Sequence, residues 1–217
     1  MKGLLKNNFY AAQASAKWLF AALALLGSAL VITGGGQAWA VPYSLLCMAC
    51  FPVNALAALR RESSSKWNKY KLTTPVRRSD IIKSYFISQL LWMLAGAALS
   101  GAFIGASALL GGVPFDRELD LLMVFTCGTS VNLFVSALFY PLFYLGGEDR
   151  SEAALGIGLV GAVGIVAALV WAINLAFGFK MNLVQTVLSA AILLACALAF
   201  FAASYFFTSA IFKRKEY

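Results

Sequence analysis

The sequence predicts an all-α, polytopic membrane protein with six transmembrane helices, folded as a single domain over residues 1–217. Of the 217 residues, 61% are apolar and only 12% are charged, which is about half the charged share of a soluble domain. The charges are also segregated, because five stretches of 27 to 42 residues contain no Asp, Glu, Lys or Arg. A soluble domain cannot keep so much uncharged apolar chain away from water.

The number of spans follows from the length of these stretches. A bilayer core is crossed by about 20 helical residues. The first stretch, residues 18–59, is about twice that length, and the Gly34-Gly35-Gly36-Gln37 sequence inside it favours a turn. We therefore divide it in two and expect one span from each of the other four stretches. The expected spans cover residues 18–33, 39–59, 81–110, 119–145, 153–177 and 183–212.

The basic residues predict the orientation. If both termini are cytoplasmic, 15 of the 17 Lys and Arg residues lie inside, and only Arg117 and Lys180 lie outside. Cytoplasmic loops of membrane proteins carry such an excess. The same excess explains the net charge of +8, so that no nucleic-acid partner is expected.

Residues 3–17 precede the first span and form a modest amphipathic pattern. Leu5, Phe9, Ala12 and Ala16 recur at helical spacing. The pattern predicts an N-terminal helix that lies in the interface of the cytoplasmic leaflet, in contact with membrane lipid. An inward extension of the first span, with Lys17 snorkelling toward water, is the alternative.

The loop of residues 60–80 is the largest polar segment between spans. With Lys83 at the entry to the third span, it carries eight basic and two acidic residues. Trp67 and Tyr70 fall on one narrow arc of a helical wheel, and Pro75 would end that helix. The loop therefore predicts a short cytosolic helix with an aromatic face. This face either docks on a cytosolic partner or anchors the loop on anionic lipid.

Residues suited to catalysis are scarce. The sequence has no histidine and no GxxxxGK[ST] phosphate-binding motif. Cys47 and Cys50 have the spacing of a redox motif, but they lie in an apolar span without a polar neighbour that would activate a thiol. We expect no catalytic, cofactor-binding or metal-binding residues in this chain.

A few amides and small residues lie within the expected spans. Asn132, Asn174 and Gln89 either bond to neighbouring helices or line a substrate pathway. Two small-residue patterns would permit close helix approach, one at Gly101 and Gly105 and one that includes Gly158. Prolines at 42, 52 and 141 are expected to kink their helices.

Residues 62–85 resemble a stretch found in the permeases of small bacterial ABC transporters of type 2. That stretch has a Glu, a Trp-x-x-Tyr sequence, a Leu-Pro-like pair, an Arg, and a Lys at the entry to the third span. Among these permeases, the chain is most similar to permease subunits of exporters for phenol-soluble modulins, which are amphipathic cytolytic peptides. The matching residues here are Glu62, Trp67, Tyr70, Leu72, Pro75, Arg77 and Lys83.

The resemblance implies a permease subunit in the bacterial cytoplasmic membrane that moves amphipathic peptides or other membrane-active, lipophilic cargo out of the cell. Two permease copies, identical or paralogous, would each bind a cytosolic ABC ATPase subunit that holds ATP and Mg²⁺. The segment around Trp67 would be the coupling helix that docks on this ATPase. The docking residues it implies are Glu62, Ser63, Lys66, Trp67, Lys69, Tyr70, Arg77 and Arg78.

Two other functions remain open at this point. A substrate-capture subunit of a vitamin importer can also have six spans and this size, although it would need more polar residues near the outer face. A membrane thiol oxidoreductase built on Cys47 and Cys50 is the second alternative.

Overall fold

A computed structural model describes residues 2–34, 38–64, 77–111, 118–147, 150–178 and 181–214. This part of the chain is helical and contains no strand. Each of its six helices is long and apolar enough to cross a membrane, so the expected all-α architecture with six spans is confirmed. The helices are α1 (Lys2–Ile32), α2 (Ala40–Ser64), α4 (Arg78–Gly111), α5 (Glu118–Gly146), α6 (Ser151–Phe177) and α7 (Leu183–Arg214).

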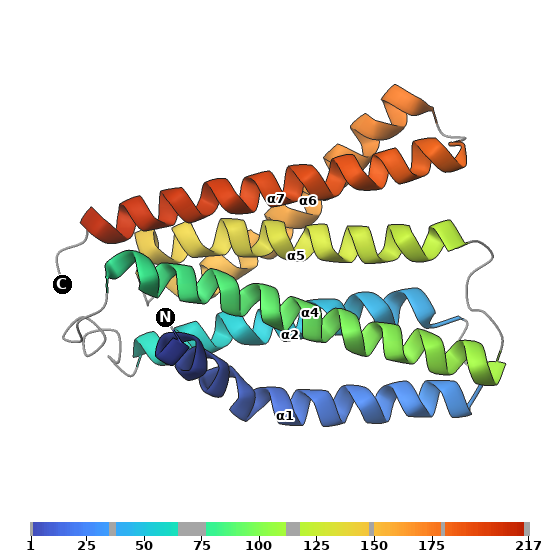
Figure 1. The fold of residues 1–217 in the computed structure, drawn as a ribbon, viewed down its shortest axis with the longest axis horizontal. Helices are drawn as coiled ribbons and strands as arrows, with labels where there is room; N and C mark the ends of the chain where they lie inside the picture. Colours follow the sequence, from blue (N-terminus) through green and yellow to red (C-terminus); the bar gives the residue numbers. More distant parts are fainter. Residues whose placement is uncertain are drawn as a thin grey trace.

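The helices form two groups of three. Helices α1, α2 and α4 pack together in one group, and α5, α6 and α7 pack together in the other, where α5 contacts both α6 and α7. Helix α6 crosses behind α5 and α7 in the view of Figure 1. The groups meet mainly where α2 packs on α5 and α4 packs on α7. The smaller cluster of buried apolar side chains lies among α1, α2 and α4, and the larger one joins α5, α6 and α7 to the last turns of α2 and the first turns of α4.

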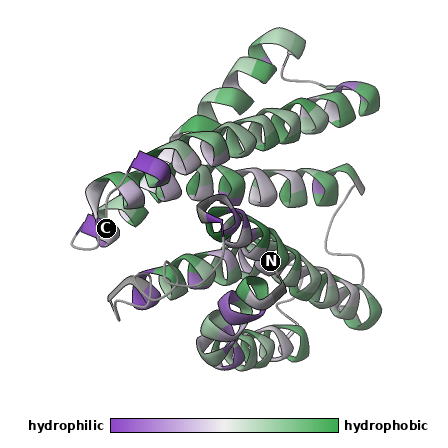
Figure 2. Ribbon diagram, turned by 60° about the vertical axis from the view of Figure 1, so that its left-hand side comes forward, coloured by the Kyte–Doolittle hydropathy of each residue, from purple (hydrophilic) through white to green (hydrophobic). Residues whose placement is uncertain are grey.

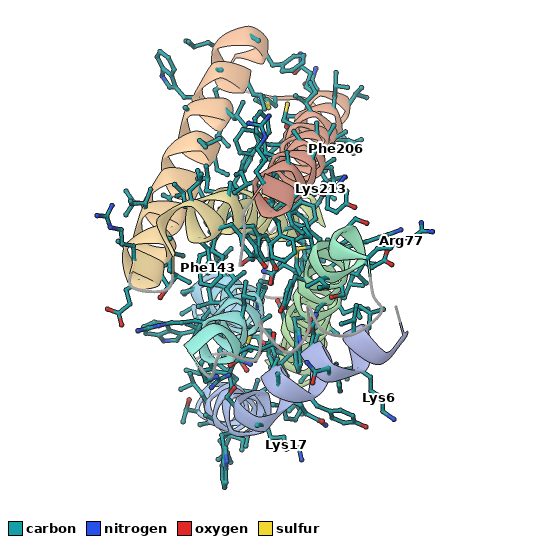
Figure 3. All side chains as sticks on the ribbon, turned by 90° about the vertical axis from the view of Figure 1, so that its left-hand side faces the viewer. Lys6, Lys17, Arg77, Phe143, Phe206 and Lys213 are labelled. Atoms are coloured by element: carbon teal, nitrogen blue, oxygen red, sulfur yellow. The ribbon has the colours of Figure 1, made fainter. Side chains whose placement is uncertain are left out.

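Both ends of the chain lie at one end of the bundle (Figure 1). The starts of α1, α4 and α6 and the last turns of α2, α5 and α7 lie there as well, and we call this the terminal end. Figure 3, a view onto this end, shows Lys6, Lys17 and Arg77 pointing outward. The arrangement is that of a bundle with an even number of spans. That the terminal end faces the cytoplasm stays a prediction from the distribution of Lys and Arg.

The outer surface of the bundle is apolar. Figure 2 shows hydrophobic residues along most of the length of the helices and the most hydrophilic residues mainly near their ends. Large side chains such as Trp18 (81% exposed) and Leu109 (88%) project from it. Since an apolar surface of this extent is stable only in an apolar solvent, these side chains are suited to contact lipid.

The structure changes three of the expected helix boundaries. Residues 3–17 do not form a separate helix but the first half of α1, which changes direction between this half and the rest (Figure 1). Helix α2 continues to Ser64 and α4 begins at Arg78, so that the loop expected at residues 60–80 is partly helical. The charged residues that end α2 bond to other helices, as described below, and this lets the helix extend past the apolar stretch.

Small residues permit close contact between helices at specific places. A Cβ atom at Gly96 of α4 would lie 2.7 Å from the backbone oxygen of Cys47 in α2, and one at Gly158 of α6 would lie 3.3 Å from the backbone oxygen of Val135 in α5. The expected close approach at Gly158 is thus confirmed. Gly101 and Gly105 have nothing within 4 Å of their Cβ positions, so they make no such approach within the described part of this chain.

Candidate functional site

The last turns of α2 bring three consecutive residues into contact with three other helices. Arg60 pairs with Glu152 at the start of α6, with 2.7 Å between Nη2 and Oε1. Arg61 donates from Nη2 to Ser15 Oγ of α1 at 2.8 Å. The third residue, Glu62, bonds to both α1 and α4. We call residues 60–62 the junction turn.

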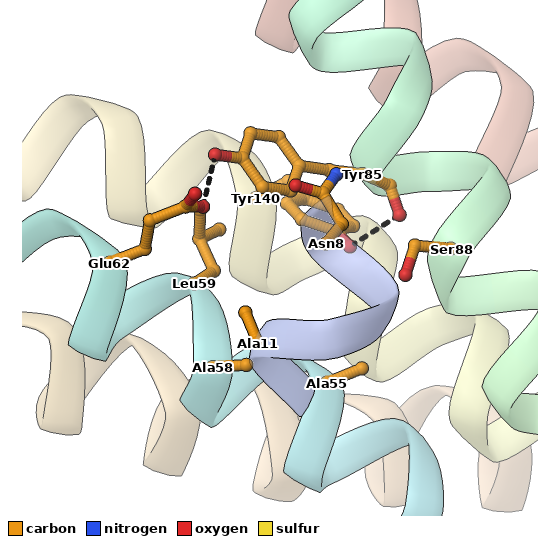
Figure 4. Close-up of a pocket in the computed structure, with 9 residues that line it drawn as sticks. All are labelled: Asn8, Ala11, Ala55, Ala58, Leu59, Glu62, Tyr85, Ser88 and Tyr140. Atoms are coloured by element: carbon orange, nitrogen blue, oxygen red, sulfur yellow. Dashed lines mark hydrogen bonds between the residues drawn. The ribbon is translucent and has the colours of Figure 1, made fainter. Parts of the chain in front are cut away.

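Glu62 is buried, with 8% of its surface exposed. Its Oε2 accepts a hydrogen bond of 2.7 Å from the Tyr85 hydroxyl of α4, and its Oε1 accepts one of 2.9 Å from Asn7 Nδ2 of α1 (Figure 4 shows the bond to Tyr85). A buried carboxylate is costly unless donors surround it. Two donors from two different helices therefore fix Glu62 and, through it, the relative positions of α1 and α4.

A cavity of about 10 Å³ adjoins Glu62, roughly the space for one water molecule. Further polar contacts surround it. Asn8 Nδ2 of α1 donates to Ser84 Oγ of α4 at 2.9 Å. The Tyr140 hydroxyl of α5 donates to the Tyr85 backbone oxygen at 3.2 Å (Figure 4). The terminal ends of four helices thus meet in one buried polar cluster.

The first half of α1 has a second attachment to α2. Asn54 of α2 accepts a 2.7 Å bond from Ser15 Oγ and donates a 3.1 Å bond to the Ala12 backbone oxygen. Asn7 also bonds to Glu62 and Ser15 to Arg61 of the junction turn. Together these bonds hold the amphipathic residues 3–17 against the bundle. Sequence reasoning noted Asn54 as a polar residue near the end of a span but did not identify Asn7 or Ser15. The sequence offers only one sign of these contacts, which is that the polar side chains share a helical face with alanines. This sign does not identify which residues are the partners.

The structure describes the residues expected to dock on an ATPase only in part. Arg77 is exposed just before α4, whereas Glu62 faces the interior of the bundle. Ser63 lies in α2 and Arg78 begins α4. Lys66, Trp67, Lys69 and Tyr70 lie outside the described residues, and their docking role stays a prediction.

The three amides within the spans take different positions. Asn132 Nδ2 of α5 donates to the Met48 backbone oxygen of α2 at 3.0 Å, so this amide forms an interhelical bond. Gln89 Nε2 of α4 donates to Ser136 Oγ of α5 at 2.7 Å, and Ser136 in turn donates to the Asn132 backbone oxygen. Asn174 is half-buried near the end of α6, away from this network. Two of the three amides thus join helices rather than line a channel.

Two of these helices contain a proline whose missing hydrogen bond is replaced from a neighbouring helix. In an α-helix the N–H of residue 52 would bond to the oxygen of residue 48, but Pro52 has no N–H. Asn132 of α5 donates to that oxygen instead. Likewise Pro141 leaves the Ala137 oxygen of α5 without its helical donor, and Ser204 Oγ of α7 donates to it at 2.6 Å. Both prolines are therefore stabilised by tertiary contacts.

A groove runs between α1 and α4 for most of their length. It consists of one hollow of about 640 Å³ nearer the terminal end and a second of about 370 Å³ beyond it, which meet at Leu99. The groove is open along one side, where Phe9 and Phe20 are 42% and 52% exposed. Trp92 of α4 lies at its floor, stacked between the rings of Phe9 (5.2 Å) and Phe51 (6.1 Å). We call this feature the lateral groove.

The lining of the lateral groove is almost wholly apolar. Lys17 is the single charged residue among the described residues that line it, and it lies in the hollow nearer the terminal end. The other lining residues of the two hollows are Phe9, Gln13, Ala16, Phe20, Phe51, Trp92, Ala95, Ala98, Leu99, Ala102, Ala24, Gly27, Ser28, Val31, Ile32, Tyr43, Phe103, Ala106 and Leu110.

Six helices that are each long and apolar enough to cross a membrane define a multi-pass membrane protein. The chain belongs to the ABC-2 family of transporter proteins, since the family model described as "ABC-2 family transporter protein" matches residues 3–213. No curated protein matches the chain. Membership makes it the transmembrane permease component of an ABC transporter, a component that is generally non-catalytic and works with an ABC ATPase subunit. The vitamin-importer and thiol-oxidoreductase alternatives are not favoured by this match.

Proposed function

We propose that this permease exports amphipathic peptides or other membrane-active molecules across the bacterial cytoplasmic membrane. The lateral groove is the observation that carries the proposal. On α4 its lining extends from Trp92 to Leu110, which is about 27 Å of helix and close to the roughly 30 Å thickness of a hydrocarbon core. A cargo already dissolved in the membrane could enter such a groove from the side.

The chemistry of the groove favours cargo with a large apolar face. A polar solute would lose its hydration against the apolar lining and gain few hydrogen bonds in return. An amphipathic helix would lay its apolar side against Phe20, Trp92 and Leu99 and keep its polar side toward water or lipid headgroups. Lys17 lines the hollow nearer the terminal end, where its ammonium group could pair with an acidic group of such a cargo.

The transporter would contain two permease copies, identical or paralogous, each bound to a cytosolic ABC ATPase subunit. ATP and Mg²⁺ would bind that subunit. On the permease, the docking contacts would come from the segment between α2 and α4. Trp67 and Tyr70 are suited to be buried anchors, and Lys66 and Lys69 to be contacts at the rim. With the terminal end in the cytoplasm, ATP-driven movement would act on the cytoplasmic end of the groove.

Reconstitution tests this proposal. The permease and its ATPase would be placed in proteoliposomes with a fluorescently labelled synthetic amphipathic peptide of about 20 residues. We expect ATP-dependent movement of the peptide in the outward direction. Ala98→Trp and Ala102→Trp, which fill the larger hollow, should lower the transport rate about tenfold, equivalent to about 1.4 kcal/mol in the barrier.

Ala168→Trp is the matched control, because Ala168 is exposed on α6 and does not line the groove. It should transport like the wild type. Absence of ATP-dependent transport by the wild-type complex would refute peptide export. Equal rates for the groove-filling variants and the control would refute the groove as the cargo path.

A further inference from the structure

We infer that the larger hollow of the lateral groove is a binding site for an anionic phospholipid of the leaflet at the terminal end. The phosphate of this lipid lies at Lys17, and one of its acyl chains lies along the hollow. A cargo that enters the hollow must displace the lipid. The inference concerns the permease by itself, and it does not depend on what the transporter exports or on how the ATPase docks.

The level of the hollow in the membrane is the first support. Lys17 is the last charged residue before the charge-free stretch of residues 18–59, so its level on α1 marks the border of the hydrocarbon core. Trp92 of α4 lines the same hollow, and Trp residues are enriched at this border. Phospholipid phosphates lie just outside the hydrocarbon core. A lipid beside the hollow therefore carries its phosphate at about the level of Lys17.

The length of the hollow corresponds to one leaflet. On α4 its lining extends from Trp92 to Ala102, which is ten positions along the chain and about 15 Å of helix. This is about half the roughly 30 Å thickness of a hydrocarbon core, and one acyl chain reaches to that depth. The smaller hollow continues from Leu99 to Leu110 on the side of the other leaflet. One chain would thus occupy the larger hollow and end where the smaller one begins.

The polar groups of the larger hollow suit an anionic headgroup. Gln13 and Lys17 both line it and lie one helical turn apart, on the same side of α1. Neither side chain makes a hydrogen bond or an ion pair within the described part of the chain, so both are available to a ligand. No Asp or Glu is among the described residues that line the hollow. The site therefore attracts an anion.

The position of Lys17 allows it to serve both the headgroup and the chain. Lys17 is exposed and points outward in Figure 3. A lysine in this position can lay its methylene groups along the apolar lining and hold its ammonium group at the mouth of the hollow, near water and headgroups.

The apolar lining accepts an acyl chain but cannot select a lipid. The rings of Phe20 and Phe51 lie on one side of the hollow, and the small side chains of Ala95, Ala98 and Ala102 lie on the other. A chain that moves from bulk lipid into this hollow exchanges one apolar environment for another, so it gains little from the hydrophobic effect. The contact of the headgroup with Lys17 therefore decides which lipid is retained.

Photo-crosslinking on the full-length permease in nanodiscs tests the inference without ATP, ATPase or peptide. The probe is phosphatidylglycerol with a diazirine group at the end of one acyl chain, and the matched probe is phosphatidylcholine with the same chain. The labelled peptides are identified by mass spectrometry. In the wild type, the anionic probe should label residues 95–102 about fivefold more than the zwitterionic probe, because one basic residue at the membrane surface attracts anionic lipid by that factor.

Lys17→Gln should abolish the preference for the anionic probe, and Lys17→Arg should retain it. Lys6→Gln is the matched control, because Lys6 is an exposed lysine of the same half of α1 that does not line the hollow. It removes the same charge and should label like the wild type.

Filling the space for the chain provides a second measurement. Ala98→Trp should lower the labelling of α4 by both probes, since the indole would occupy the hollow. Ala168→Trp introduces the same side chain on the exposed surface of α6 and should leave the labelling of α4 unchanged. Equal labelling in these two variants would refute the hollow as the site of the acyl chain.

Three other results would overturn the inference. The first is equal labelling of the wild type by the two probes, and the second is a preference that persists in Lys17→Gln. The third is a loss of preference in Lys6→Gln as large as in Lys17→Gln, which would indicate a general attraction of the terminal end for anionic lipid. Peptide export is measured separately by transport, so failure of the lipid site and failure of the proposed function are distinguishable.

Discussion

Asn132 of α5 donates to the Met48 backbone oxygen of α2 the hydrogen bond that Pro52 cannot donate. The two three-helix groups meet along α2 and α5, so this bond stabilises a helix and joins the groups at the same time. An amide in mid-membrane had two possible roles from the sequence. The geometry assigns this one to helix contact.

A double-mutant cycle tests this assignment. Asn132→Leu should lower the free energy of unfolding in detergent by about 1 kcal/mol, since it removes one interhelical hydrogen bond in the membrane. In a Pro52→Ala background, residue 52 regains an N–H and can bond to Met48 itself. The same Asn132→Leu change should then cost less. An equal cost in both backgrounds, measured by urea unfolding, would show that Asn132 does not compensate for the proline.

Ser204 should likewise stabilise the helix that contains Pro141. Ser204→Ala removes the donor to the Ala137 oxygen, which leaves a buried carbonyl without a partner, and we expect a loss of about 1 kcal/mol in stability. Ser28→Ala is a suitable control, since its hydroxyl bonds only within its own helix and is exposed. If both alanine variants unfold at the same urea concentration, the Ser204 contact has no stabilising role.

Two glycines of α4 should respond oppositely to alanine. At Gly96 the added methyl group would meet the backbone of α2 at 2.7 Å, so Gly96→Ala should cost about 1–3 kcal/mol through forced separation of the helices. At Gly101 there is open space, and Gly101→Ala should be neutral or gain up to about 1 kcal/mol from helix propensity. Thermal unfolding in one detergent compares them directly. A Gly96→Ala variant as stable as Gly101→Ala would contradict the close approach of α2 and α4.

Trp67→Ala should weaken binding of the ATPase subunit while membrane insertion stays normal. A Trp anchor at a protein interface typically contributes at least 2 kcal/mol, so co-purification in mild detergent should fall clearly below that of the wild type. Trp18→Ala is a control, because Trp18 projects from the outer surface of α1. Equal recovery of the ATPase with all three proteins would count against docking through Trp67.

The orientation of the bundle can be measured with reporter fusions. A cytoplasmic reporter after Tyr217 should be active, and a reporter fused after Gly112 should behave as external, because the excess of Lys and Arg lies at the terminal end. The opposite pattern would place the junction turn outside the cell. That result would rule out any contact of this turn with a cytosolic ATPase.

The helices could be predicted from the sequence because long charge-free stretches have few stable structures other than membrane-spanning helices. The ends of the helices were harder to predict. Arg60 and Glu62 look like loop residues in the sequence, yet they extend α2 because Glu152, Asn7 and Tyr85 neutralise or bond them. These partners are 23 to 55 positions away in the case of Glu62, and no local pattern reveals such pairs.

The candidate site could likewise be predicted only in part. The sequence indicated Asn132 and Gln89 as unusual and Glu62 as part of a motif, since polar groups in apolar surroundings stand out. It did not indicate the lateral groove, because a groove depends on how α1 and α4 pack and not on any residue alone. Nor did it indicate that Ser204 and Asn132 compensate for prolines, since that requires knowing which helices are neighbours.

The position of the junction turn on α2 fixes the rotational register of that helix. Glu62 follows Met48 by fourteen positions, which corresponds to nearly four helical turns, or about 21 Å. The Met48 oxygen must face α5 while Glu62 faces α1 and α4. One inserted residue between them would rotate the junction turn by about 100° and detach every one of its partners at once. In this architecture, the interval from Met48 to Glu62 must therefore keep its length.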